Sequence, residues 1–321
     1  MNIGILGAGN IARKMAETVS RMENADLYGI ASRSFDKAKA FAEEFNIPNC
    51  FGSYEELAKD GNVDLVYIAT PHSRHYEDCM LCLENRRNVL CEKAFTVNAK
   101  QADEVLNYAR RRGLFISEAM WTRFMPMRSV LDGIVGSGEI GEISALTANL
   151  GYELSHVERL QKPELAGGAL LDLGVYTINF ALMAFGNNIS DIRSSCVKNG
   201  YGVDKTNSII ITFADGKTAL LHSNAAAATD RLGIIYGTEG RIEFYNINNC
   251  EGIKVIPAEG AVTEYKTPAQ ITGYEYEVEA SLKAIGEGKT ETPFMPHSET
   301  LRVMEIMDSL RKEWGVKYPF E

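Results

Sequence analysis

A glycine-containing turn that directly follows a short apolar run is the feature that most constrains this chain. Residues 3–6 are apolar, and the next six are Gly7-Ala8-Gly9-Asn10-Ile11-Ala12. In this spacing Gly7 permits a tight turn, Gly9 permits a pyrophosphate to approach the backbone, and Ala12 lets a helix pack closely on the strand. The amides of Asn10 and Ile11 would lie at the positive end of that helix. The stretch therefore predicts a strand, a turn and a helix that bind a dinucleotide.

Strands and helices alternate over the first 120 residues. Apolar runs predict strands at 27–32, 65–69, 88–91 and 114–117. Helical periodicity and capping residues predict helices at 34–45, from the Ser53-x-x-Glu56 capping box, at 73–84 and at 98–112. This order predicts a doubly wound parallel sheet of the α/β class, the Rossmann arrangement, with ligands at the carboxyl ends of its strands.

Beyond residue 120 the predicted strands follow one another directly. They are expected at 143–154, 208–213, 218–223, 232–236 and 241–245, with an apolar helix at 170–185 and two closing helices at 274–285 and 298–314. Such an order predicts an α+β domain built on a large, mostly antiparallel open sheet. We therefore expect two domains, residues 1–120 and 121–321, with the active site in the cleft between them.

Composition excludes several classes of function. The formal charge of −10 disfavours nucleic acid and acidic membrane surfaces as partners. The longest apolar stretch, 169–186, is interrupted by Asp172 and Asn179 and predicts a buried helix rather than a membrane span. Six cysteines without a secretory leader favour reduced thiols and a cytoplasmic location. No His, Asp or Glu grouping has the spacing of a metal site.

The end of the second predicted strand bears on which nucleotide binds. An NAD site places an Asp or Glu here to accept a hydrogen bond from the ribose 2'-hydroxyl, but this chain has Ser32 and Arg33. Arg33 offers a planar fork for phosphate oxygens, Ser32 a hydroxyl and Lys37 further positive charge. We therefore predict NADP(H) as the cofactor; alternatively, Arg33 only faces solvent.

Two further segments lie at the same predicted edge of the sheet, after the third and fourth strands. We expect them to line the nicotinamide pocket, although capping or packing is the favoured role of His75. The residues in question are Thr70, Pro71, His72, His75, Glu92 and Lys93.

Four motifs together resemble the Gfo/Idh/MocA oxidoreductase family along nearly the whole chain. They are GAGNIA at 7–12, VYIATPHSRHYE at 66–77, CEKAF at 91–95 and GGALLDLGVY at 167–176. The stretch EAMWTRF at 118–124 is similar to the branch of dimeric dihydrodiol dehydrogenases and NADP-dependent xylose dehydrogenases.

The resemblance implies that Lys93 is the catalytic lysine and Tyr176 the catalytic tyrosine. This pairing makes chemical sense because hydride transfer from a carbinol carbon requires proton removal from its hydroxyl, and a tyrosine with an ordinary pKa near ~10 needs a neighbouring ammonium to serve as a base. Asp172 lies one helical turn before Tyr176, so both are expected on one face. The family's proline after the lysine is Ala94 here.

Trp121, Arg123 and Phe124 suggest a wall that stacks on a substrate ring, or else a hydrophobic hinge core, and His156 is a candidate substrate contact. We expect an NADP(H)-dependent oxidoreductase acting on a secondary alcohol or carbonyl of a sugar, polyol or cyclic trans-diol. The alternative is a nucleotide-binding sensor without turnover. We also expect a homodimer formed through the open sheet, where Ile209, Ile211 and Phe213 alternate opposite Leu220 and His222.

Overall fold

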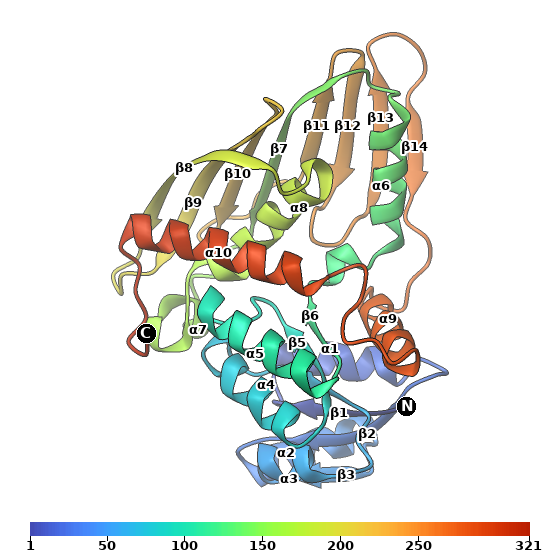
Figure 1. Ribbon diagram of the computed structural model, residues 1–321, viewed down its shortest axis with the longest axis vertical. Helices are drawn as coiled ribbons and strands as arrows, with labels where there is room; N and C mark the ends of the chain where they lie inside the picture. Colours follow the sequence, from blue (N-terminus) through green and yellow to red (C-terminus); the bar gives the residue numbers. More distant parts are fainter. The chain divides into compact units, whose positions relative to one another are not determined.

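The computed structural model describes residues 1–321, which divide into two compact units. The first comprises residues 1–124 and 270–304, and the second comprises residues 125–269 and 305–321. Each unit contains one sheet (Figure 1).

The first unit is built on a six-stranded parallel sheet in the order β3-β2-β1-β4-β5-β6. This confirms the predicted doubly wound class. The strands are β1 (Asn2–Leu6), β2 (Asp26–Ala31), β3 (Asn49–Phe51), β4 (Leu65–Ile68), β5 (Asn88–Glu92) and β6 (Ile116–Ala119).

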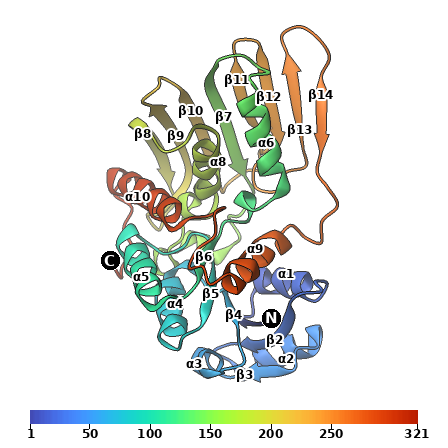
Figure 2. The same ribbon diagram turned by 45° about the vertical axis from the view of Figure 1, so that its right-hand side comes forward.

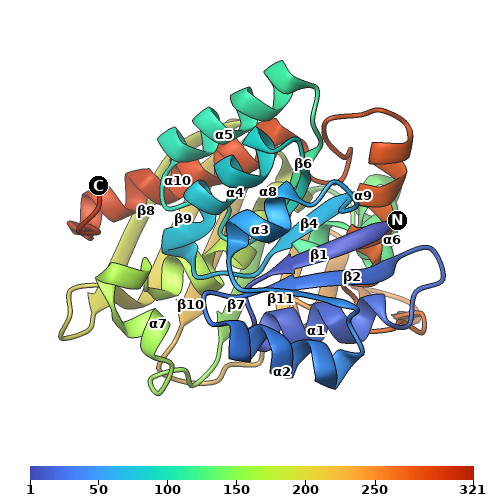
Figure 3. The ribbon, with the colours of Figure 1, turned by 90° about the horizontal axis from the view of Figure 1, so that it is seen from below.

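Helices cover both faces of this sheet. Figure 3 shows α1 and α2 on one face and α3 and α4 on the other. Apolar residues of α1, α2 and α9 form one buried cluster with β1, β2 and β4. The helices are α1 (Asn10–Val19), α2 (Phe35–Phe45), α3 (Tyr54–Lys59), α4 (His75–Glu84), α5 (Ala99–Arg112) and α9 (Glu275–Gly286), with single 3-10 turns at His72–Arg74 and Trp121–Arg123.

The second unit contains an eight-stranded sheet in the order β14-β13-β12-β11-β7-β10-β9-β8. All neighbouring strands pair antiparallel except β7 and β10, as expected for a mostly antiparallel sheet. Its strands are β7 (Ile143–Gly151), β8 (Ile189–Lys198), β9 (Asp204–Phe213), β10 (Thr218–Asn224), β11 (Gly233–Gly237), β12 (Gly240–Tyr245), β13 (Gly252–Pro257) and β14 (Thr263–Lys266).

Helices lie on one face of this second sheet (Figure 2). They are α6 (Pro126–Ser137), α8 (Val175–Phe185) and the last turns of α10 (His297–Trp314). A π-helical turn at Leu170–Gly174 leads directly into α8. The unit also contains α7 (Glu158–Gln161), which is a single turn. The helical segment Pro163–Phe185 is long and apolar enough to cross a membrane, but 83% of its most apolar 18-residue window is buried inside the protein. It is a core helix, as the sequence predicted.

The face of β9 that is exposed is not the one expected from the sequence. Ile209, Ile211 and Phe213 are at most 2% exposed, whereas Ile210 and Leu220 are 45% and 47% exposed. The expectation that the first three belong to an uncovered face together with Leu220 was therefore wrong. Alternation with a period of two shows that a strand has two faces, but it does not show which face the helices cover.

Candidate active site

The glycine turn after β1 has the geometry of an anion-binding site. Gly7 has φ +98°, and a Cβ there would lie 2.8 Å from the Ala69 carbonyl oxygen, so only glycine fits. A Cβ on Gly9 would meet no atom within 4 Å, so nothing in the chain prevents a ligand from approaching the backbone there. Ala12, in the first turn of α1, is fully buried.

The N-terminus of α1 matches this turn. No side chain caps the helix, and its first turn, which begins at Asn10 and Ile11, carries no acidic residue. The orphan amides and the positive end of the helix dipole therefore suit a pyrophosphate. The residues present fit a dinucleotide.

The carboxyl end of β2 has no carboxylate. Ser32 is nearly buried, and its hydroxyl accepts a hydrogen bond from the Ser34 amide at 3.4 Å. Arg33 and Lys37 are both exposed, and the only acidic residue in the first turn of α2 is Asp36.

The loop after β4 is tied to the loop after β5. His72 Nε2 lies 3.0 Å from the Lys93 carbonyl oxygen. His75 is fully buried, and its ring nitrogens lie 2.9 Å from the Ala94 carbonyl oxygen and 2.8 Å from that of Thr70. Both histidines therefore support the backbone that presents Lys93, and Pro71 precedes them at the start of the 3-10 turn.

Glu92, at the end of β5, also holds the backbone of Lys93 in place. Its carboxylate accepts hydrogen bonds from the Tyr67 hydroxyl and, at 3.2 Å, from the Lys93 amide. The peptide between Lys93 and Ala94 is cis. Lys93 is half-buried, at the same sheet edge as the glycine turn.

Sequence reasoning missed a second carboxyl near Glu92. Glu277 on α9, which packs on β5, is fully buried, and neither of its carboxyl oxygens makes a hydrogen bond. Burial, and then the charge of Glu92, raise its pKa well above the usual range. Both effects favour the protonated, neutral carboxyl of Glu277. An isolated Glu in an amphipathic helix gives no sequence signal for this.

The residues proposed as a substrate wall are packed within the first unit. Trp121 stacks on Tyr274 with ring centroids 4.2 Å apart, and Phe124 packs against Phe294. Arg123, 5% exposed, pairs with Glu299 at 2.8 Å. These contacts match the alternative of a packed core.

The candidate proton-transfer residues of the second unit lie in and just after a buried π-helical turn. Asp172 is 4% exposed and pairs with Arg159 at 2.8 Å, while Tyr176 is 6% exposed. The side chain of His156 is exposed, and its Nδ1 lies 3.3 Å from a carboxylate oxygen of Glu153.

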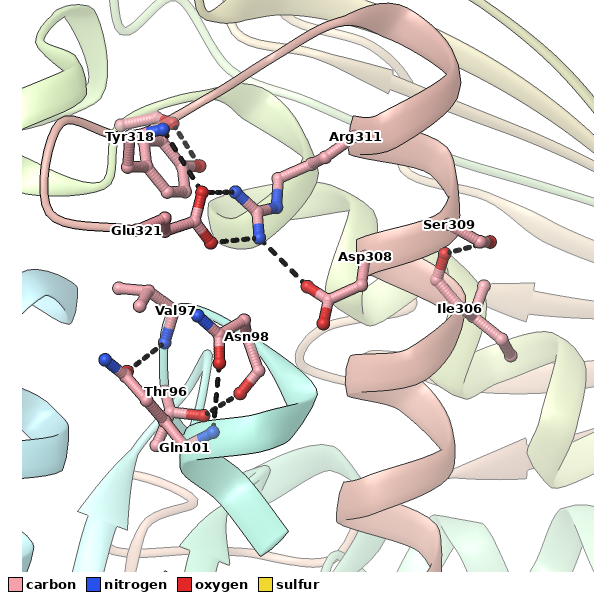
Figure 4. A network of polar contacts seen from close by, with 11 residues as sticks. Thr96, Val97, Asn98, Gln101, Ile306, Asp308, Ser309, Arg311, Tyr318 and Glu321 are labelled. Atoms are coloured by element: carbon pink, nitrogen blue, oxygen red, sulfur yellow. Dashed lines mark hydrogen bonds and ion pairs between the residues drawn. The ribbon is translucent and has the colours of Figure 1, made fainter. Parts of the chain in front are cut away.

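The Gly167-Gly168 loop before this turn is fixed by its neighbours. A Cβ on Gly168 would lie 2.4 Å from Asp204 Oδ1, and the Tyr318 hydroxyl donates to the Gly167 carbonyl at 2.8 Å. Tyr318 belongs to a C-terminal network in which Arg311 binds both oxygens of Glu321, at 2.9 and 2.7 Å (Figure 4).

The structure thus brings the glycine turn, Ser32, Arg33, the loop after β4 and Lys93 to one edge of the parallel sheet. Separately, it places Asp172 and Tyr176 together in the second unit. No group of three or more His, Cys, Asp and Glu side chains is arranged to hold a metal ion. The fold and the glycine turn define a dinucleotide-binding protein of the Rossmann class.

Comparison with known proteins places the chain more narrowly. Residues 1–120 match the oxidoreductase family with an NAD-binding Rossmann fold, Gfo/Idh/MocA, and residues 130–243 match the C-terminal domain of that family. The chain is 33% identical to trans-1,2-dihydrobenzene-1,2-diol dehydrogenase of Xenopus tropicalis over 98% of both proteins.

Two solved structures share the fold. A 3-ketoreductase from Actinomadura kijaniata, in complex with TDP-benzene and NADP, superimposes with a TM-score of 0.85 and 26% identity over 97% of this chain and 96% of that one. An aldose-aldose oxidoreductase from Caulobacter crescentus gives 0.88 and 18% identity over 98% and 97%. The chain belongs to the Gfo/Idh/MocA family and is an NAD(P)-dependent oxidoreductase acting on alcohol or carbonyl groups.

Proposed function

We propose that the chain is an NADP(H)-dependent dehydrogenase or reductase whose substrate is a secondary alcohol, or the matching carbonyl, of a sugar, polyol or cyclic trans-diol. The observation that carries the proposal is the support of Lys93, which is held at the edge of the sheet that also carries the glycine turn. The 33% identity to a trans-dihydrodiol dehydrogenase over nearly the whole chain supports the diol.

In this proposal Lys93 and Tyr176 act on the same substrate hydroxyl. The nicotinamide, when bound, supplies the hydride chemistry. The Tyr176 hydroxyl exchanges the proton of the substrate oxygen, and the Lys93 ammonium favours the ionised tyrosine. Asp172, which forms an ion pair with Arg159, is the next candidate for proton exchange.

NADP(H) is proposed over NAD(H) because β2 ends in Ser32 and Arg33 rather than in a carboxylate. Trp121, Arg123, Phe124 and His156 remain candidate substrate contacts. We further propose the domain division 1–120 and 121–321, in which residues 270–304 of the second domain return to the first compact unit. We also propose a homodimer formed through the open sheet face and a cytoplasmic location.

Absorbance of NADPH tests the proposal directly. We expect oxidation or reduction of the nucleotide with at least one member of a panel of sugars, dicarbonyls and trans-dihydrodiols. Lys93→Met and Tyr176→Phe should each lower kcat on the order of 10²-fold while nucleotide binding persists. A wild-type protein that binds NADPH but turns over no substrate would favour the sensor alternative, and normal kcat in Tyr176→Phe would move the role to Asp172.

A further inference from the structure

A buried carboxylate fixes an arginine beside the nucleotide edge of the first unit. Asp78, fully buried on α4, accepts a hydrogen bond from the Thr70 hydroxyl at 2.7 Å and one from Arg74 Nη2 at 3.0 Å. The Arg74 side chain remains 46% exposed. Asp78 therefore holds the Arg74 guanidinium on one side, through Nη2. The donors on the other side of the guanidinium stay available for a ligand.

Arg74 and Arg33 converge on one tyrosine. Tyr54, the first residue of α3, is 9% exposed. Burial raises the pKa of its phenol and Asp78 raises it further, whereas Arg33 and Arg74 both lower it, Arg33 also through a hydrogen bond. The positive charges of Arg33, after β2, and Arg74, after β4, therefore both act on this hydroxyl.

The two arginines differ in their carboxylate partners. Asp78 pairs with Arg74, and the exposed Glu77 also acts on it, whereas Arg33 forms no ion pair with a carboxylate. The cluster therefore holds two guanidinium forks close to the end of β2, and one of them has no carboxylate partner. A dianionic phosphomonoester is the ligand that this arrangement suits, because its oxygens can accept from both forks.

We propose that Arg74 is a second residue that reads the 2'-phosphate of the adenosine ribose, together with Arg33, and that Asp78 is the positioning residue that holds it. This inference rests on the proposed preference for NADP(H). A purely structural role for the Arg74–Asp78 pair predicts instead that loss of Arg74 affects every nucleotide equally.

Calorimetric titration with adenosine 2',5'-bisphosphate and with 5'-AMP separates these roles without requiring turnover. Arg74→Gln should weaken the bisphosphate about tenfold or more, equivalent to about 1.4 kcal/mol, and leave 5'-AMP within about twofold. Arg111→Gln, an exposed arginine in the last turn of α5, is the matched control and should change neither.

Asp78→Asn tests positioning through a double-mutant cycle. It should weaken the bisphosphate in the wild-type background and have little further effect in Arg74→Gln. Kinetics should agree, with kcat/KM falling for NADP+ more than for NAD+ in Arg74→Gln.

The failures can be told apart. If the wild type binds the bisphosphate no more tightly than 5'-AMP, the proposed NADP(H) preference is wrong and this inference falls with it. If Arg33→Ala abolishes the discrimination but Arg74→Gln leaves it intact, or weakens both ligands alike, the preference stands and only the role of Arg74 is overturned.

Discussion

His75 Nδ1 lies 2.9 Å from the carbonyl oxygen of Ala94, the residue that follows Lys93. The other ring nitrogen lies 2.8 Å from the Thr70 carbonyl, so one buried imidazole joins the loops after β4 and β5. Burial lowers the pKa of His75, while the hydrogen bonds to Thr70 and Ala94 oppose this. A buried histidine thus sets the course of the backbone that carries Lys93.

Replacing this ring should affect both stability and turnover. His75→Ala should cost on the order of 2–4 kcal/mol of unfolding free energy, because it leaves a cavity and removes a buried hydrogen bond. It should also lower kcat, since Lys93 loses support. Urea denaturation and steady-state kinetics measure the two effects. His156→Ala, at an exposed position, should stay within about 0.5 kcal/mol, and equal unfolding free energies for both variants would contradict the bridging role.

Glu118 predicts how stability depends on pH. Its carboxyl is 1% exposed; burial raises its pKa to about 7, although Thr300, Arg123 and the Phe95 amide oppose the shift. The folded state thus keeps this proton up to about pH 7, whereas the unfolded chain releases it near ~4.3. The contribution of Glu118 to the free energy of unfolding is therefore greatest at low pH, and it is lost as the pH rises from the unfolded-state pKa to the folded-state pKa.

Glu118→Gln removes that ionisation cost. At pH 8 the variant should be more stable than wild type by on the order of 1–3 kcal/mol, and at pH 5 the difference should shrink below about 1 kcal/mol. Thermal and urea unfolding across this range test the difference, with exposed Glu23→Gln as the control. Parallel stability curves for wild type and Glu118→Gln would refute the assignment.

Gly168 gives a steric prediction for the second unit. Its φ is +121°, and an added Cβ would lie 2.4 Å from Asp204 Oδ1, while Asp204 Oδ2 accepts from the Leu170 amide at 2.8 Å. Gly168→Ala should therefore destabilise the protein by on the order of 2 kcal/mol or more.

A second glycine supplies the control. Gly136 lies in α6, and a Cβ added there would meet no atom within 4 Å, so Gly136→Ala should stabilise by about 0.5–1 kcal/mol. Chemical denaturation measures both. Similar small effects at the two positions would show that Asp204 moves aside without cost.

What the sequence could predict was largely local. The turn at Gly7, the Ser53 cap and the apolar run through Tyr176 each carry their signal within a few neighbouring residues, and the structure contains the corresponding turn, cap and helix. The three-residue strand β3 was not predicted, because Asn49–Phe51 is half-buried and too short for any periodicity.

Long-range contacts explain the rest. In the sequence, Asp78 and Glu277 look like ordinary surface acids of helices. In the fold, Asp78 is buried where Thr70 and Arg74 donate hydrogen bonds to it, and Glu277 is buried where α9 packs on β5. Likewise, Ile210 and Ile211 are chemically identical neighbours, and only the placement of the helices decides that Ile211 is core and Ile210 is exposed.

Ile210 also gives the last prediction, on the proposed homodimer. It pairs directly with Leu220 across β9 and β10, and both side chains are nearly half exposed on the sheet face opposite the helices. Adjacent Ser208 and His222 hydrogen-bond on the same face at 3.0 Å, so the surface mixes apolar and polar groups as many interfaces do.

If two copies associate here, each substitution occurs twice in a symmetric contact. Ile210→Lys should therefore weaken dimerisation by about 100-fold or more, because it buries two ammonium groups near each other. Light scattering over a concentration series measures this shift, with Val262→Lys, at a 51% exposed position outside the strands, as the control. A wild-type protein with the mass of one chain at micromolar concentration would exclude the dimer, and an Ile210→Lys variant as dimeric as Val262→Lys would place its contact elsewhere.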